Sequence, residues 1–478
     1  MKLAQETGET PRTARRLLWL ALAVAACTGS HIAQAATPEE RLASRWVDPF
    51  IGTDGTGHTF PGATVPFGMV APSPDNSYSG WAYASGYQYR APRIQGFSNS
   101  HMSGTGIADL GDVLLQPSVG RRWTEATLDF SRAYLRKTES ATPGYYAVKL
   151  LDNQVVVELT ATQRVALQRY TFKQGGHVQV LVDVQHVLHY LEGPRVTDSN
   201  VTVDEKSGTM QGRTHLVNWT ARELVFAVQF SQPIAQMTPL PARTGEKAPR
   251  YLLDFELAQS RVLEVRVALS TVDPVGARNN LNDAQGRSFN AVRHDADAAW
   301  EQLLSRLDID VPSRQRRIFY TALYHALLHP SDIADADGRV RGPTGTIGPA
   351  RGGHYYSTLS LWDVSRAQFP LLALLVPERV DDIVNSLLQH QQAQGYLPLF
   401  AVWGGETWCM IGNPSLPIIA HAVSTGFHGF DWHEALNAMV TTSTAPRPSA
   451  PEWAQHDWDV YEKYGFLPFD KVKGEAVS

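Results

Sequence analysis

The run VQVLVDV at residues 178–184 decides the first half of the fold, because every second residue in it is valine. The run LEVRVAL at residues 263–269 alternates in the same way, with Glu264 and Arg266 between its apolar residues. A period of two is typical of β-strands with one buried face. Such runs continue from about residue 127 to 270, with turn signals and no helical pattern between them. They predict an antiparallel β-sandwich, whose bounds we set at residues 42–282.

The pattern changes near Asp283 from a period of two to the 3.6-residue period of a helix. We expect a linker helix over residues 283–310, followed by helices only from 311 to 478. Pro377 suits a helix start, and Asp431 with Glu434 makes a capping box before the apolar residues Leu436, Met439 and Val440. The predicted chain is therefore multidomain, β then α.

Two loops of the helical half combine a carboxylate with tryptophan. HYYSTLSLWDVSR (354–366) contains Asp363, and QGYLPLFAVWGGETWCMIG (394–412) contains Glu406. Hydroxyl acceptors beside flat apolar faces suit a sugar ring. The structural alternative is that Asp363 pairs with Arg366 and Glu406 caps a loop. Composition alone leaves both open.

The stretch GTDGTGHTFPGATVPFGMVAPSPDN, at residues 52–76, is rich in glycine, proline and aromatic residues and poor in charge. A plain surface loop would be polar. We interpret the stretch as backbone held close to a ligand or to another domain.

Composition excludes several function classes. The net charge is −5 with no basic block, so nucleic acid is not an expected partner. His58, His101 and His354 show no zinc-binding spacing, so a zinc site is not expected there. Cys27 and Cys409 are the only cysteines, and no Cys-His motif supports Cys409 as a nucleophile, so we interpret it as a buried inert thiol.

Residues 1–35 resemble an export signal. Arginines precede an apolar core at 17–26, and an A-x-A cleavage site ends at Ala35. A twin-arginine signal (Arg15-Arg16) and a lipoprotein box with a lipid anchor at Cys27 are the open variants. No later segment is long and apolar enough to span a membrane. We therefore expect a periplasmic or extracellular protein that is not integral to a membrane.

Several long motifs together resemble glycoside hydrolase family 92, in chain order and over residues 46–478. The motifs are VDPFIGTDGTGHTFPGATVPFGMVAPSPD (47–75), SGYQYRAPRIQGFSNSHMSGTGIADLGDVLLQP (85–117), YYSTLSLWDVSRAQFPLL (355–372), GETWCMIG (405–412) and YEKYGFLPFDKVKGEAVS (461–478).

The resemblance implies an exported, calcium-dependent exo-α-mannosidase that acts on mannose-containing glycans such as N-glycans by inverting hydrolysis. It implies a β-sandwich packed on an (α/α)6 barrel, with the glycine-rich stretch contributing to a sugar pocket at their junction. Asp363 would accept bonds from mannose hydroxyls, Trp362 and Trp81 would shape the apolar side, and Arg366 would hold Asp363. The substrate-binding residues implied are Gly57, His58, Trp81, Trp362, Asp363, Arg366, Glu406 and Thr407.

The sequence also departs from the family pattern. An (α/α)6 barrel needs twelve helices, and only about six are predicted after Ser313, so we expect an incomplete barrel. The family's acid, base and most calcium ligands are expected beyond Ser478, which leaves no catalytic residue expected within this chain. At residues 98–101 the chain has SNSH where the family tends to have SHTH. After MIG (410–412) it has Asn413-Pro414 where the family usually has Tyr-His.

Two functional classes follow. One is an α-mannosidase fragment, expected to be inactive by itself. The other is a non-catalytic exported glycan-binding protein, against which the exposed apolar faces of a half-built barrel argue.

Overall fold

The structure, a computed structural model, describes most of the chain after the predicted export signal. The residues described are 42–77, 80–120, 129–152, 154–257, 260–447, 449–451, 454 and 458–471. The expected signal at 1–35 and the anchor candidate Cys27 lie outside them. Within these residues, no helix combines the length and the apolar character that crossing a membrane requires.

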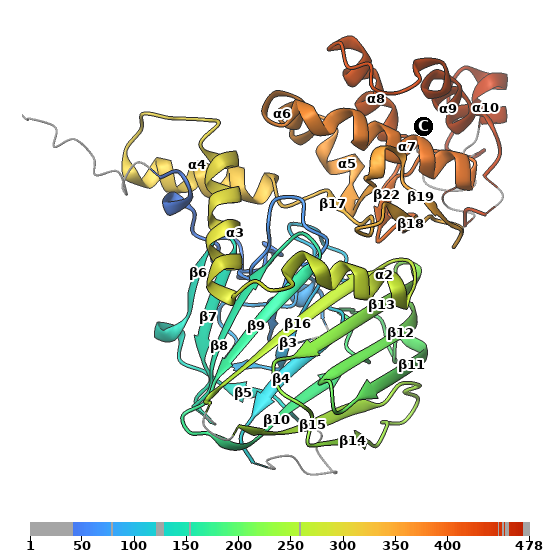
Figure 1. The fold of residues 1–478 in the computed structure, drawn as a ribbon. Coiled ribbons are helices and arrows are strands. Elements are labelled where there is room, and N and C mark those ends of the chain that lie inside the picture. Colours follow the sequence, from blue (N-terminus) through green and yellow to red (C-terminus); the bar gives the residue numbers. More distant parts are fainter. Residues whose placement is uncertain are drawn as a thin grey trace, which may run out of the picture. The chain divides into compact units, whose positions relative to one another are not determined.

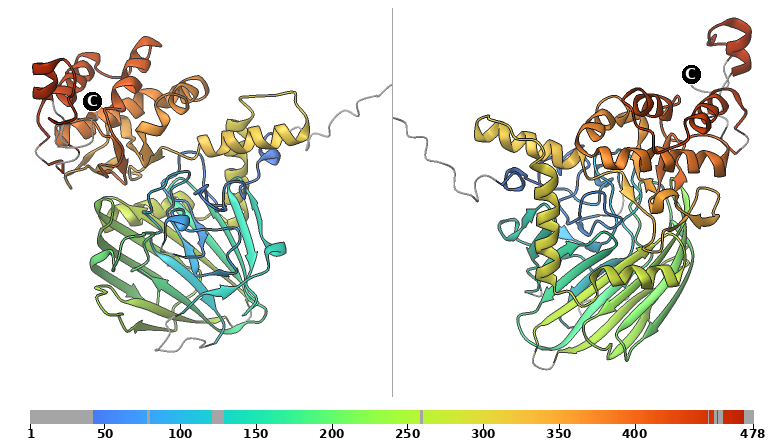
Figure 2. Two further views of the ribbon diagram at one scale, coloured as in Figure 1. Left: turned by 180° about the vertical axis from the view of Figure 1, so that it is seen from behind. Right: turned by 45° about the horizontal axis from the view of Figure 1, so that its top comes forward.

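The first part of the described chain is a sandwich of two antiparallel sheets, as the alternating runs predicted (Figure 1). The six-stranded sheet has the order β1 (Ser73–Asp75), β3 (Gly96–Ser98), β4 (Leu114–Ser118), β10 (Gly176–Asp183), β15 (Arg250–Leu257) and β14 (Gln236–Leu240). The eight-stranded sheet has the order β11 (Val196–Asp204), β12 (Thr209–Val217), β13 (Ala221–Phe230), β16 (Val262–Ser270), β9 (Val165–Thr171), β8 (Val156–Ala161), β7 (Tyr145–Lys149) and β6 (Ser140–Thr142). Figure 2 shows both sheets from two further directions.

Short elements complete this part of the chain. They are the pair β2 (Arg93–Ile94) and β5 (Arg132–Ala133), and the 3-10 helices η2 (Ser44–Trp46), η3 (Trp81–Tyr83) and η4 (Arg136–Thr138).

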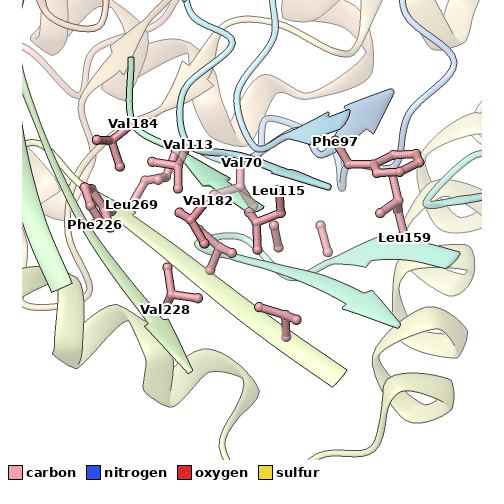
Figure 3. Packing of buried hydrophobic residues seen from close by; sticks show 14 of the residues in the cluster. Val70, Phe97, Val113, Leu115, Leu159, Val182, Val184, Phe226, Val228 and Leu269 are labelled. Atoms are coloured by element: carbon pink, nitrogen blue, oxygen red, sulfur yellow. The ribbon is translucent and has the colours of Figure 1, made fainter. Parts of the chain in front are cut away.

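The core of the sandwich lies between the two sheets. Val178, Val180 and Val182 of β10 point into it, which is why valine recurs at every second position. Phe97 of the six-stranded sheet and Leu159 of the eight-stranded sheet meet inside this core (Figure 3). Burial of these alternating side chains fixes the register, since a one-residue slip would turn them outward.

Helices follow the last sandwich strand. Asp273 caps α2 (Pro274–Asn280) by accepting a bond from Gly276 N at 2.7 Å, and α2 packs against β13 and β16 (Figure 1). After η5 (Leu281–Ala284) comes α3 (Phe289–Leu304), which is shorter than the predicted linker helix. Trp300 of α3 is fully buried, and its Nε1 donates to Thr64 O at 2.7 Å.

Most of the remaining helices share a second core. It is built around α7, which packs against α8 and α9. Gly395, with φ of 94°, ends α7 in the left-handed region that favours glycine. The helices are α4 (Ser313–Ala326), α5 (Leu361–Val364), α6 (Gln368–Leu375), α7 (Val380–Gln394), α8 (Ser415–Ser424), α9 (Trp432–Thr444) and α10 (Trp458–Tyr464), with η6 (Arg351–Gly353) and η7 (Pro377–Arg379).

The expectation of helices only after residue 311 is wrong. Short antiparallel strands connect the helices: β17 (Ser331–Asp332) with β20 (Tyr356–Ser357), β18 (Arg339–Arg341) with β19 (Ile347–Pro349), and β21 (Leu359–Ser360) with β22 (Phe400–Val402) and β23 (Gly405–Glu406). Each spans two or three residues, too few for an alternating pattern to be visible in the sequence.

The buried face of α9 also differs from the one expected from its apolar residues. Asp431 caps the helix as predicted, accepting from His433 N and Glu434 N. The residues buried against α7 and α8 are small, however: Ala435, Ala438 and Thr442. Leu436 and Val440 are instead 53% and 52% exposed.

Candidate functional site

The two loops that carry a carboxylate beside tryptophan form one small antiparallel sheet. β21 belongs to the 354–366 loop, and β22 and β23 belong to the 394–412 loop. Ser360 pairs with Phe400, and Glu406 lies on the next strand. Facing residues of such strands lie about 5 Å apart. We call β21, β22, β23 and the short helix α5 the loop platform.

Asp363 and Trp362 form the exposed part of the loop platform. The Ser360 hydroxyl, at the start of α5, donates a hydrogen bond to Asp363 Oδ2 and so orients the carboxylate. Asp363 is exposed, and Trp362 is 47% exposed. An oriented carboxylate can accept bonds from sugar hydroxyls, while an indole face can cover the C–H side of the ring.

Arg366 does not hold Asp363, contrary to the expectation from the sequence. Both side chains are described and exposed, and no ion pair joins them in the described chain. The Ser360 hydroxyl takes the place of the expected guanidinium. Asp363 is therefore not paired with the arginine of its own loop.

Glu406 binds its own loop. Its side chain is buried, and it accepts bonds from the backbone N–H groups of Leu399 at 2.7 Å, Phe400 at 3.1 Å and Trp408 at 3.0 Å. Burial raises the pKa of this carboxyl, although the three donors act in the opposite direction. The geometry favours the loop-capping interpretation of Glu406 over the sugar-binding one.

Thr407 and Cys409 follow Glu406 and are also committed to the loop. Thr407 is buried, and its Oγ1 accepts a bond from Cys409 N at 3.1 Å. Burial raises the pKa of the Cys409 thiol, and the charges of Asp363 and Glu406 raise it further. A thiol that resists ionisation is a poor nucleophile, which agrees with the inert part of the interpretation. Cys409 is only partly buried, however, and not fully buried as expected.

Left-handed backbone conformations at non-glycine residues are concentrated in the segments with sugar-site motifs. Thr358 (φ 63°), Trp403 (φ 50°), Trp408 (φ 58°) and Met410 (φ 75°) lie in the two platform loops, and His58 (φ 51°) lies in the glycine-rich stretch. Each such conformation costs about 1–3 kcal/mol. Strained residues of this kind cluster at ligand sites, which adds weight to these segments.

His58 and Trp81 form a second pair of rings. The two rings meet edge to face with centroids 4.6 Å apart. Burial lowers the pKa of His58, so its imidazole is neutral near pH 7. Trp81 is 52% exposed and offers a second indole surface.

The glycines of the 52–76 stretch are explained by the chain's own packing. A Cβ on Gly57 would lie 2.1 Å from Gly52 O, and one on Gly62 would lie 2.2 Å from Pro72 O. Only glycine allows backbone to approach so closely. The stretch is held close to itself, in addition to any contact it makes with a ligand.

A chain of contacts joins this stretch to α6, the helix that follows α5 of the loop platform in the sequence. Gly104 N donates to His58 O at 2.7 Å, and Ser103 N donates to Nε2 of His329 at 3.2 Å. His329 O in turn accepts from Gln368 Nε2, in the first turn of α6, at 3.0 Å. Burial lowers the pKa of His329 to about 4, which keeps its ring neutral and able to accept. A single cleft shared by Gly57, His58, Trp81 and the loop platform stays a prediction.

Sequence reasoning missed Ser360 and His329. Ser360 could have been found, because Ser-x-x-Asp is a local pattern in which a hydroxyl and a carboxylate meet at a helix start. His329 gave no signal, since its partner Ser103 lies 226 residues away in the sequence.

Comparison with known proteins decides the family. Residues 46–270 match the glycosyl hydrolase family 92 N-terminal domain, and residues 276–478 match the glycosyl hydrolase family 92 catalytic domain. The chain belongs to glycosyl hydrolase family 92. The gap between the two matches, residues 271–275, follows β16 and ends within the first turn of α2; the sequence pattern predicts the boundary at residue 282.

Solved structures of family 92 share this fold. An α-mannosidase of the family from Bacteroides thetaiotaomicron, solved in complex with mannoimidazole, is 32% identical, with a TM-score of 0.82 over 90% of this chain and 58% of its own. An inverting mannosidase from B. thetaiotaomicron VPI-5482 is 24% identical, with a TM-score of 0.78 over 90% of this chain and 59% of its own.

A curated family relative is described as an uncharacterized secreted glycosidase of Arthroderma benhamiae. It is 24% identical over 95% of this chain and 58% of its own length. The family 92 chain thus spans about three fifths of the relatives that it matches.

The described part of this family 92 chain does not by itself fit the calcium ion that the resemblance implies. Calcium takes about 6–8 oxygen ligands. Within the described residues, no group of three or more His, Cys, Asp or Glu side chains could hold a metal ion. No catalytic step through calcium is therefore derived from these residues.

Proposed function

We propose that the chain carries the sugar-binding part of an exported family 92 α-mannosidase. The whole enzyme would release mannose from α-mannosides such as N-glycans by calcium-assisted inverting hydrolysis. The observation that carries the proposal is the exposed carboxylate of Asp363, oriented by Ser360 and adjacent to the exposed indole of Trp362.

The roles of the individual groups follow from their surroundings. Asp363 would accept bonds from two neighbouring mannose hydroxyls. Trp362 and Trp81 would cover the apolar face of the ring, and neutral His58 would support Trp81 from its edge. Glu406 would keep the loop in shape, because its oxygens already accept three backbone bonds.

Hydrolysis needs more than the loop platform supplies. Inverting glycosidases use two carboxyl groups about 6.5–9.5 Å apart, on opposite faces of the sugar. Glu406 is engaged inside its loop, so the platform offers Asp363 as its one exposed carboxylate in these motifs. We therefore assign to these residues the binding of mannose and not the transfer of a proton.

The same argument supports a second candidate, a non-catalytic exported glycan-binding protein. Sugar binding by Asp363 and two indoles requires neither a general acid nor a general base. Mannose release separates the two candidates, because a binding protein retains affinity without turnover in any context.

The experiment compares the 478-residue chain with a version extended by the remaining family helices. Each is incubated with calcium and an aryl α-mannoside. The proposal expects both to bind methyl α-mannoside and the extended version alone to release mannose. An extended version that binds and never releases mannose supports the binding protein instead.

Selectivity and calcium dependence complete this experiment. Methyl α-glucoside, which differs at the O2 hydroxyl, should bind more weakly than the mannoside to both versions. Chelation of calcium should abolish release by the extended version. Equal affinity for the two sugars would contradict a mannose site.

A further inference from the structure

A large cavity lies on the outer side of the six-stranded sheet and is not part of the loop platform. Its volume is about 630 Å³, within the range of small-molecule sites. Asp183 and Arg250, which face each other on β10 and β15, lie along it, and the segment 185–195 forms another part of its lining.

The polar groups along this cavity are built into the fold. Arg250 Nε donates to Asp183 Oδ2 at 2.7 Å, and its two terminal nitrogens bind Glu246 at 2.6 and 2.8 Å. All three side chains are largely buried. Such a network holds its geometry without a ligand and presents fixed dipoles to the cavity.

Gln185 supplies a polar atom that lacks a partner. The side chain is 8% exposed, and its Nε2 donates to Ala248 O at 3.0 Å, which fixes the amide orientation. Its Oε1 is buried and receives no hydrogen bond from the described residues. A buried carbonyl of this kind costs free energy unless a donor such as a ligand hydroxyl reaches it.

The charges of the lining favour a neutral ligand. Four acidic side chains and three arginines line the cavity, so their charges nearly cancel. Tyr190 and Phe130 add aromatic surface. Fixed hydrogen-bonding groups beside aromatic rings, with little net charge, suit a polyhydroxylated neutral molecule better than an anion.

The cavity borders the candidate sugar site beside Trp81. His189 O accepts a bond from Gly80 N, next to Trp81, at 3.2 Å. Tyr190, which lines the cavity, packs edge to face on Trp219 with centroids 5.8 Å apart.

We propose that this cavity is a second carbohydrate subsite, which holds a neutral α-mannoside branch of the same glycan whose terminal mannose reaches Asp363. The inference rests on the proposed function, since it takes the loop platform as the site of the terminal sugar. Gln185 accepts a hydroxyl bond from the branch, and Tyr190 packs against a sugar face.

The test is a calorimetric titration of the full chain, in calcium, with methyl α-mannoside and with a branched α-mannopentaose. Tyr190→Ala and Gln185→Met should each weaken binding of the pentaose about tenfold and leave binding of the monosaccharide unchanged. Tyr190→Phe, which keeps the ring, should retain most of the affinity.

Gln179→Met is the matched control. Gln179 lies on the same strand β10, is 5% exposed, and donates through Nε2 to Asp254 Oδ1 at 2.7 Å. It does not line the cavity. This variant carries the same loss of a buried amide, so it should bind both sugars like the unmodified chain.

The outcomes separate the two proposals. Pentaose binding that is unchanged in both cavity variants overturns the subsite. Weaker pentaose binding in the cavity variants, with methyl α-mannoside binding insensitive to Asp363→Asn, supports the cavity and overturns the assigned role of Asp363. Binding of neither sugar by the unmodified chain overturns both.

Discussion

The Ser360 hydroxyl donates a hydrogen bond to the carboxylate of Asp363, three residues further along the chain. Ser360 is also the residue through which β21 pairs with Phe400 of β22. One residue therefore connects the orientation of the exposed carboxylate to the sheet that joins the two loops. A sugar-binding group placed in this way is held by the platform and not by a free loop.

We expect Ser360→Ala to weaken binding of methyl α-mannoside without unfolding the chain. The variant removes the donor that orients Asp363 and leaves the charge in place, so the loss should be about 3- to 10-fold. Ser360→Thr retains a hydroxyl and should restore most of the affinity. Equal loss in both variants would show that the hydroxyl itself is not the cause. Calorimetric titration measures each affinity.

We expect Glu406→Ala to destabilise the fold. Removal of the carboxylate leaves the N–H groups of Leu399, Phe400 and Trp408 without their acceptor. The free energy of unfolding should fall by about 2–4 kcal/mol. Glu378→Ala is the control, because its side chain is 53% exposed and should change the stability by less than about 1 kcal/mol. Urea unfolding of the two variants decides the role of Glu406.

We expect the chain to lose stability as the pH falls from about 6.5 toward 4. Burial lowers the pKa of His325 and His329 to about 4 and that of His390 to about 3. The unfolded chain, with histidine pKa values near 6.5, then binds more protons than the folded chain in this interval. Stability therefore rises with pH there. Carboxyls act on both sides. Burial raises the pKa of Asp335 to about 6 and also raises the pKa values of Asp109, Glu139, Asp297, Asp382 and Glu406, and these groups oppose the histidines. The lowered pKa values of Asp129, Glu158, Glu246 and Asp273 act with the histidines.

Replacement of one histidine tests this assignment. His390→Gln should flatten the dependence of the melting temperature on pH between 4 and 6.5. His294→Gln should leave the dependence unchanged, because that side chain is 83% exposed. Parallel melting curves for His390→Gln and the unmodified chain would rule out the assigned group.

We expect a glutamine to be tolerated at position 436 of α9 and to destabilise the fold at position 435. Leu436→Gln should change the free energy of unfolding by less than about 0.5 kcal/mol, because Leu436 is 53% exposed. Ala435→Gln should cost about 2 kcal/mol or more, since Ala435 is 1% exposed and the larger side chain has no room. Thermal unfolding measures the loss of stability in each variant. A larger loss for Leu436→Gln than for Ala435→Gln would mean that α9 turns Leu436, and not Ala435, toward the core.

The sequence contained enough information for the order of the domains. Valine alternation in β10 and β16 reflects a real buried face, and the capping residues Asp431 and Pro377 act where they were expected. Signals of this kind are local. They depend on residues within one or two turns of each other.

The rest of the candidate site depends on contacts between distant segments. The strands of the loop platform are two or three residues long and pair residues about 40 positions apart, such as Ser360 with Phe400. Glu406 accepts hydrogen bonds from the backbone of its own loop. A backbone N–H group does not depend on the residue type, so the sequence does not reveal these partners. The burial of Ala435 instead of Leu436 is likewise set by the packing of α7 against α9.

Asp363 is the group that we propose to bind mannose on the loop platform. The most direct measurement is a calorimetric titration of methyl α-mannoside into the 478-residue chain and into its Asp363→Asn variant, with matched melting temperatures as the control for folding. We expect measurable binding by the unmodified chain and a loss of at least about tenfold in the variant, because an amide accepts hydroxyl bonds less strongly than a carboxylate. Equal affinity of the two proteins for the mannoside would contradict this role of Asp363.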